Sequence, residues 1–252
     1  MSGQASASAS RALPPLLLGL VGAAWLALAL WGASPAARWL GHGQRLDGSA
    51  GWLALALFLV GWALMVTAMM LPTAGGLLRD FAVLVRARPE RNRLRALVAA
   101  GFIAAWLVMG ALFRLFDEQV HSAVASSLWL QARPRLLAAG VLILAALYQF
   151  TPLKRRCLSA CRTPRSFIYR FWRGGRPAGD ALRIGLAYGR SCIGCCWALM
   201  LVMFALGTAN LAWMFGLAAV MAVEKGTAAG RRLSLPVGLA LGAAGVATAL
   251  GL

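Results

Sequence analysis

Long uncharged and mostly apolar runs alternate with short polar segments along the whole chain. Six runs contain no Asp, Glu, Lys or Arg: 12–37, 48–78, 96–113, 136–153, 191–223 and 233–252. A helix needs about 20 mostly apolar residues to cross the ~30 Å hydrocarbon layer of a bilayer, and these runs meet or approach that length. The pattern therefore predicts at least six transmembrane helices.

The run 191–223 is too long for one straight crossing, since it would form a helix of about 50 Å at ~1.5 Å per residue. The sequence Gly207-Thr208-Ala209-Asn210 in its middle is typical of a turn. We therefore predict an all-α, polytopic transmembrane bundle of about seven helices, or six if this run is undivided. The expected helices are 13–33, 51–73, 95–116, 135–152, 182–206, 210–225 and 234–251.

Domain organisation follows from the same pattern. The Ser/Ala-rich residues 1–12 are expected to form a disordered tail, and 13–252 a single transmembrane domain with a basic cytoplasmic connection at 153–180. Aromatic residues alternate with arginines over 165–173, which indicates a short amphipathic helix on the inner leaflet. A cleaved signal sequence is the alternative for the first helix, but its basic region is weak and its apolar run is long.

Composition and charge agree with a membrane protein. Hydrophobic residues make up 61% of the 252 residues, far more than one globular core needs. The net charge is +18, but the Lys and Arg residues lie between apolar spans and lack the pattern of a nucleic-acid-binding domain. With the N-terminus inside, 20 Lys and Arg fall on the cytoplasmic side and 5 outside, so the positive-inside rule predicts this orientation. We expect a multi-pass protein of a bacterial cytoplasmic membrane.

All five cysteines lie in one part of the chain. Cys192, Cys195 and Cys196 share one helix face by their spacing, and Met200 continues the same stripe. Cys157 and Cys161 form a further pair in the preceding connection. Thiolates and thioethers are soft donors that favour Cu(I) or zinc, and the predicted side is reducing, so permanent disulfides are not expected.

Two other interpretations of the cysteines remain open. Cysteine and methionine are also common packing residues in apolar cores. Alternatively, the pair Cys192-Ile-Gly-Cys195 resembles a dithiol redox motif, although no cysteine on the outer side would relay its electrons.

Residues elsewhere can contribute to such a site. Met69 and Met70 end the second expected helix on the cytoplasmic side, where Pro72 would open the last turn. Glu224 lies at the inner end of the sixth helix, and an acid at membrane depth is a functional candidate, or a solvated interfacial residue. On the expected outer side, Asp117 and His121 are one helical turn apart and could bind a harder metal ion. The alternative is that they are ordinary polar residues at a solvated helix end.

Several further motifs stand in the chain: Ala68-Met-Met-Leu-Pro72, Tyr148-Gln-Phe-Thr-Pro-Leu-Lys154, Cys192-Ile-Gly-Cys-Cys-Trp-Ala-Leu-Met200, Asn210-Leu-Ala-Trp-Met214 and Glu224-Lys225. Together they resemble the bacterial predicted metal-binding integral membrane proteins over roughly 50–230. The resemblance implies metal binding as a function but no established activity. A His of that family often stands near the position of Tyr188, and a Met often precedes the Asn210-Leu pair, where this chain has Thr208-Ala209.

Three functional hypotheses follow. The first is a membrane protein that binds a soft ion, copper before zinc, and handles or delivers it with a membrane or soluble partner. The second is a non-catalytic scaffold or partner subunit, and the third a membrane thiol oxidoreductase. No ATP-binding loop, Ser-His-Asp set or dinucleotide motif stands in the sequence, so nothing in it indicates an enzyme.

Overall fold

Every regular element of the described residues is helical, as the apolar runs predict. The computed structural model describes residues 15–34, 51–206, 210–227 and 230–251. The expected tail 1–12 and most of the expected turn at 207–210 lie outside them. The helices are α1 (Pro15–Gly32), α2 (Gly51–Met69), η2 (Pro72–Ala74), α3 (Gly75–Leu84), α4 (Arg91–Ala125), α5 (Leu128–Gln131), α6 (Pro134–Gln149), α7 (Pro152–Arg162), α8 (Arg165–Phe171), α9 (Pro177–Leu206), α10 (Leu211–Gly226) and α11 (Gly230–Leu250).

The lengths of these helices fit a multi-pass membrane protein. Among the described residues, α1, α2, α4, α9 and α11 are long and apolar enough to cross a bilayer, and α6 with α7 makes a sixth candidate. Residue 206 ends α9 and Leu211 begins α10, so the long uncharged run is divided as expected. Because α10 has 16 residues, or about 24 Å, it falls short of ~30 Å, and the seventh span stays a prediction.

Two prolines interrupt the apolar runs beside the cytoplasmic segments predicted from charge. The helix expected at 51–73 ends at Met69, and Pro72 starts the short 3-10 helix η2. At Pro152 the chain bends by 65° between α6 and α7, where the Thr151 hydroxyl accepts a hydrogen bond from the Lys154 amide. The segment 153–180, expected to hold one short helix, contains two: α8 lies where the amphipathic helix was predicted, and α7 precedes it.

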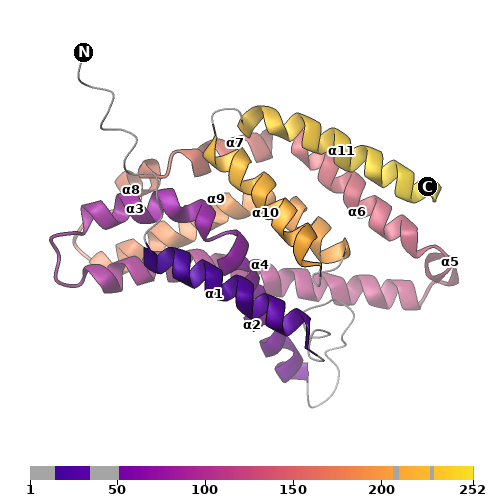
Figure 1. The fold of residues 1–252 in the computed structure, drawn as a ribbon, viewed down its shortest axis with the longest axis horizontal. Coiled ribbons are helices and arrows are strands. Elements are labelled where there is room, and N and C mark those ends of the chain that lie inside the picture. Colours follow the sequence, from indigo (N-terminus) through magenta and orange to yellow (C-terminus); the bar gives the residue numbers. More distant parts are fainter. Residues whose placement is uncertain (1–14, 35–50, 207–209, 228–229, 252) are drawn as a thin grey trace.

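Helix α9 is the central element of the bundle, and it packs against α4, α6, α7, α8 and α10 (Figure 1). Its approach to α4 is close because glycines face each other. A Cβ atom on Gly185 would collide with the Val98 carbonyl oxygen, and one on Gly189 would lie 2.7 Å from the Ala105 side chain. These pairs also show that α4 and α9 run parallel, since later residues of one meet later residues of the other.

Candidate metal centre

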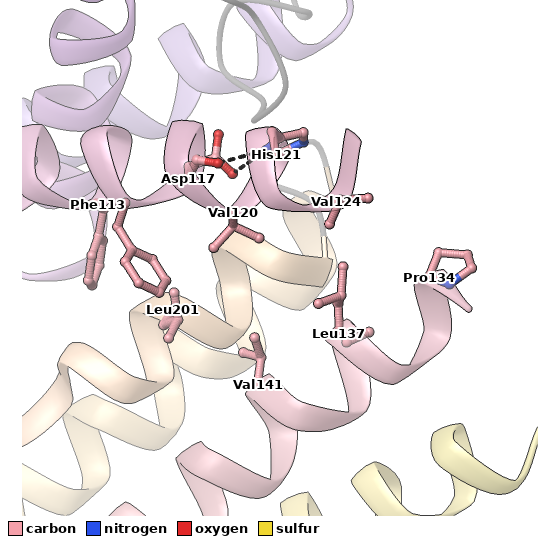
Figure 2. A pocket seen from close by; sticks show the side chains of 11 residues that line it. Phe113, Asp117, Val120, His121, Val124, Pro134, Leu137, Val141 and Leu201 are labelled. Carbon is pink, nitrogen blue, oxygen red and sulfur yellow. Dashed lines mark hydrogen bonds and ion pairs between the residues drawn. The ribbon is translucent and has the colours of Figure 1, made fainter. Parts of the chain in front are cut away.

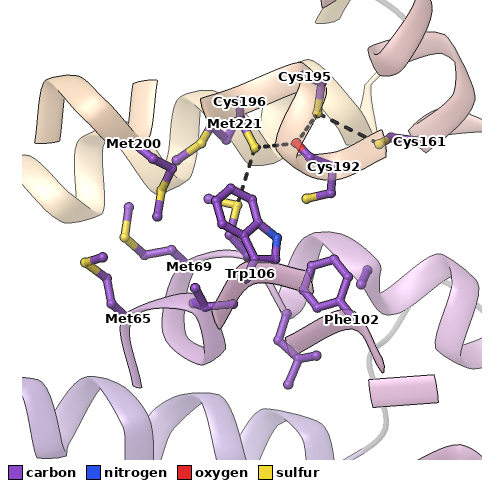
Figure 3. Close-up of a cluster of buried hydrophobic side chains, with 14 of the residues drawn as sticks. Met65, Met69, Phe102, Trp106, Cys161, Cys192, Cys195, Cys196, Met200 and Met221 are labelled. Atoms are coloured by element: carbon purple, nitrogen blue, oxygen red, sulfur yellow. Dashed lines mark hydrogen bonds between the residues drawn. The ribbon is translucent and has the colours of Figure 1, made fainter. Parts of the chain in front are cut away.

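The sulfur atoms of Cys192, Cys195 and Cys196 converge on one face of α9. Their three Sγ atoms all lie within 4.8 Å of one another, and the side chains are buried (Figure 3). The helix period explains the arrangement, because residues three and four positions apart share a face. The Cys195 and Cys196 thiols both lie within hydrogen-bonding distance of the Cys192 carbonyl oxygen, at 3.1 and 2.8 Å. The predicted convergence is confirmed.

Helix α7 brings a fourth thiol to this cluster. The Cys161 Sγ atom lies 3.8 Å from the Cys195 Sγ atom, and Cys161 is buried. Cys157, one turn earlier, is half-buried and packs against Gly194, where any larger residue would meet its Sγ atom. All five cysteines are free thiols. The turn at Pro152 thus places one cysteine of the pair at the cluster and the other at its edge.

The end of α2 supplies a thioether from another helix. The Met70 Sδ atom lies 3.7 Å from the Cys196 Sγ atom, and Met70 is fully buried. Met69 and Met200 belong to the same buried cluster. The break after Met69 also frees carbonyl groups, and the Thr73 hydroxyl donates to the Met70 carbonyl at 2.7 Å. The expected meeting of the methionines of α2 with the cysteine stripe is therefore seen for Met70.

A buried lysine of α10 touches the same sulfur atoms. The Lys225 Nζ atom lies 3.0 Å from the Cys192 Sγ atom and 3.8 Å from the Cys196 Sγ atom. It also donates to the Thr73 hydroxyl at 3.1 Å and lies 4.0 Å from the Met70 Sδ atom. From the sequence, Lys225 was named only as the neighbour of Glu224. The Glu224-Lys225 motif was the sequence feature that could have indicated its place at the thiols.

Glu224 faces a different set of partners. Its carboxylate oxygens both lie 2.9 Å from the Lys154 Nζ atom, and Ser234 donates to one of them at 3.1 Å. Gln149 accepts a further hydrogen bond from Lys154. Glu224 is 2% exposed, so it is a buried ion-pair partner and not a solvated interfacial residue. This pair joins α7 to α10 directly beside the sulfur cluster.

Two tyrosines fix the backbone around the thiols. The Tyr188 hydroxyl donates to the Cys161 carbonyl at 3.0 Å and lies 3.4 Å from the Thr73 carbonyl oxygen. The Tyr148 hydroxyl donates to the Gly194 carbonyl. Tyr188, which was singled out for its sequence position, thus contacts carbonyl groups of α7 and η2, and these contacts hold both elements against α9.

The candidate group predicted for the outer side lies within a single helix. The structure extends the helix expected at 95–116 to Ala125, so Asp117 and His121 stand inside α4 and not at its end. The His121 Nδ1 atom is 3.2 Å from an Asp117 carboxylate oxygen, and Arg114 is 3.3 Å from the other. Both residues line an apolar cavity of about 360 Å³ between α4 and α6 (Figure 2).

The chemistry of the two groups differs. Four thiols and a thioether from three helices form a soft donor set of the kind that Cu(I) and zinc prefer, whereas Asp117 and His121 offer one hard and one borderline donor. The sulfur cluster is therefore the better candidate for a metal centre. Among the described residues, the three cysteines of α9 are also the group whose donor atoms lie close enough together to share one ion.

Comparison with known proteins points to copper, one of the ions that these sulfur donors favour. A family model described as "PpoB2: Copper chaperone" matches residues 59–248. Neither the curated proteins nor the solved structures gave a match. The matched region contains every sulfur ligand candidate named above, and it overlaps the region that resembles the predicted metal-binding membrane proteins.

Proposed function

Because the chain belongs to the PpoB2 copper chaperone family, we propose that it holds Cu(I) as cargo on the thiols of Cys192, Cys195 and Cys196. The observation that carries the proposal is the mutual approach of their Sγ atoms to within 4.8 Å in a buried site. Cu(I) is one of the soft ions that sulfur ligands select, and two or three sulfur donors are enough to bind it. A recipient protein then takes the ion from this site.

Cys161 and Met70 are the neighbouring donors that complete the set. Their sulfur atoms lie 3.8 and 3.7 Å from those of Cys195 and Cys196. Because they come from α7 and α2, a copper ion held by them as well would link three helices. Cys157 is half-buried beside Gly194, which suits a first contact for an arriving ion better than a place in the final site.

We further propose that the site is loaded from the cytoplasmic side of a bacterial inner membrane, in a seven-helix arrangement with the N-terminus inside. Support comes from the two basic segments predicted to be cytoplasmic, 79–95 with its six arginines and 153–180, which contact each other. Arg165 of α8 pairs with Asp80 of α3 at 3.0 Å, and Arg88 stacks on Trp172 with 5.3 Å to the ring centroid. Cys161 lies near the end of α7, just before α8, so the thiols border this basic layer.

Metal analysis of the purified protein tests the copper site. The protein in detergent, kept reduced, is loaded with Cu(I), and the copper per chain is compared with that of the variant Cys192→Ser/Cys195→Ser/Cys196→Ser. We expect the variant to lose about one copper per chain, because serine keeps the volume but removes the soft donors. Cys157→Ser is the matched control and should keep the wild-type content.

Equal copper in the wild type and the triple variant would contradict the proposal. Loss of copper in the Cys157→Ser control as well would overturn the place given to Cys157 outside the final site. A wild type without any copper after loading would leave the cysteines as packing residues of a membrane scaffold.

A further inference from the structure

Buried methionines lie next to the thiol cluster in the core of the bundle. The chain has nine methionines, and seven of them, Met70 included, are buried in the same core cluster. They come from α2, α9 and α10, so no single amphipathic stripe accounts for them. Besides Met70, the buried methionines are Met65, Met69, Met200, Met203, Met214 and Met221.

The helix register places two of them, Met200 and Met221, in one layer. Met200 follows Cys196 by four residues on α9, and Met221 precedes Lys225 by four on α10. Met69 stands at the end of α2 beside Met70. Four residues correspond to about 6 Å along a helix axis, so Met200 and Met221 lie roughly one turn beyond the thiols. In Figure 3 the Met65, Met69 and Met200 side chains gather on the side of the cysteines away from Cys161.

Packing alone explains this arrangement poorly. Methionine is a flexible filler of irregular cores, and aliphatic and aromatic side chains make up the rest of this core. Met65, Met69 and Met200 nevertheless gather directly beside the cysteines (Figure 3) and are not scattered among those side chains. Met109 on α4, by contrast, is only partly buried at the edge of the cluster. Thioethers are soft, uncharged donors that suit Cu(I) and hold zinc poorly.

We propose that Met69, Met200 and Met221, with Met65 and Met203 following, form a second Cu(I) site that receives the ion from the thiols. In the transfer one copper–thiolate bond breaks and one copper–thioether bond forms, while copper stays Cu(I) and no electron moves. The thiolate left behind remains beside the Lys225 ammonium, 3.0 Å from the Cys192 Sγ atom. This relay rests on the proposed copper function and gives the cargo a route along α9, away from its loading side.

Copper content of two sets of variants separates the sites. After Cu(I) loading under reducing conditions, we expect about two copper ions per chain in the wild type and about one in Met69→Leu/Met200→Leu/Met221→Leu. Leucine nearly conserves the volume of methionine, so the core should stay packed. Met109→Leu is the matched control and should bind as the wild type does. The variant without Cys192, Cys195 and Cys196 should keep about one ion, held by thioethers.

Selenium absorption gives a second measurement that needs no methionine variant. In selenomethionine-labelled protein loaded with Cu(I), selenium-edge scattering should report a copper neighbour, and the signal should persist in the triple Cys→Ser variant. Absence of a selenium–copper contact in that variant, or unchanged copper in the triple Met→Leu variant, would overturn the methionine site. The thiol proposal would then still stand if the Cys→Ser variant alone loses copper. It fails separately if the Cys→Ser variant keeps all the copper of the wild type.

Discussion

The sulfur cluster and the Asp117–His121 group show two ways in which a membrane bundle gathers polar side chains. The sulfur cluster draws its members from α2, α7, α9 and α10, and the Cys192 thiol and the Lys225 ammonium are both buried. Asp117, His121 and Arg114 all belong to α4, and the His121 side chain is 48% exposed. Donors on several helices can enclose an ion, whereas donors on one helix reach it from one side only.

The charges of the two regions are balanced differently as well. On α4, Arg114 and Asp117 neutralise each other within one helical turn. At the sulfur cluster, Glu224 is paired with Lys154, so its neighbour Lys225 directs its charge to the thiols. A cation held against sulfur stabilises the negative charge that thiolates bring to a copper complex. The difference supports the proposal that the sulfur region holds an ion.

The largest effect should come from breaking the buried ion pair beside the cluster. Lys154 and Glu224 are 1% and 2% exposed, so Glu224→Gln leaves an uncompensated lysine in the interior and should cost about 3–5 kcal/mol of stability. Thermal or denaturant unfolding in detergent measures the loss. Arg165→Gln, which breaks the exposed pair with Asp80, is the control and should cost less than about 1 kcal/mol.

Similar stability of the two variants would mean that the Lys154–Glu224 pair contributes no more than a surface pair. The contrast between the enclosed sulfur region and the self-contained α4 group would then lose its energetic basis.

The sequence predicted the parts of the site that one helix determines. The spacing of Cys192, Cys195 and Cys196 fixes their common face whatever surrounds the helix, and the uncharged runs fix where helices form. Pro72 was expected to open the last turn of the helix at 51–73, and α2 ends at Met69, just before that proline. In each of these positions the local period or a single backbone constraint decides the structure, so no knowledge of the packing was needed.

The rest of the site depends on contacts between helices. Cys161 lies on α7, a short helix with few apolar residues, which the search for long apolar runs does not find. Glu224 and Lys225 are adjacent in sequence, yet successive helix positions point about 100° apart, so one side chain meets Lys154 and the other the thiols. Which neighbour each meets is decided by tertiary packing alone.

A smaller effect should follow from removing the cation at the thiols. Lys225→Met keeps an unbranched apolar stem but removes the ammonium 3.0 Å from the Cys192 Sγ atom. We expect Cu(I) affinity to fall about 10- to 100-fold, as for other groups that surround metal ligands. Competition with a Cu(I) chelator measures it, and Lys225→Arg, which retains the charge, should lose less. Equal affinity of Lys225→Met and wild type would show that the lysine only fills space.

The smallest effect belongs to the group on α4, and it completes the comparison. The parallel register of α4 and α9 aligns Cys192 with residues near 108, so Asp117 lies about nine residues, or ~13 Å, further along the bundle. An ion on the thiols is therefore out of reach of His121. His121→Gln should leave copper content and Cu(I) affinity unchanged, measured beside the Cys192→Ser/Cys195→Ser/Cys196→Ser variant in the same loading assay. Loss of copper in His121→Gln would join the two regions into one pathway, because only an ion that visits both groups could sense a change at α4.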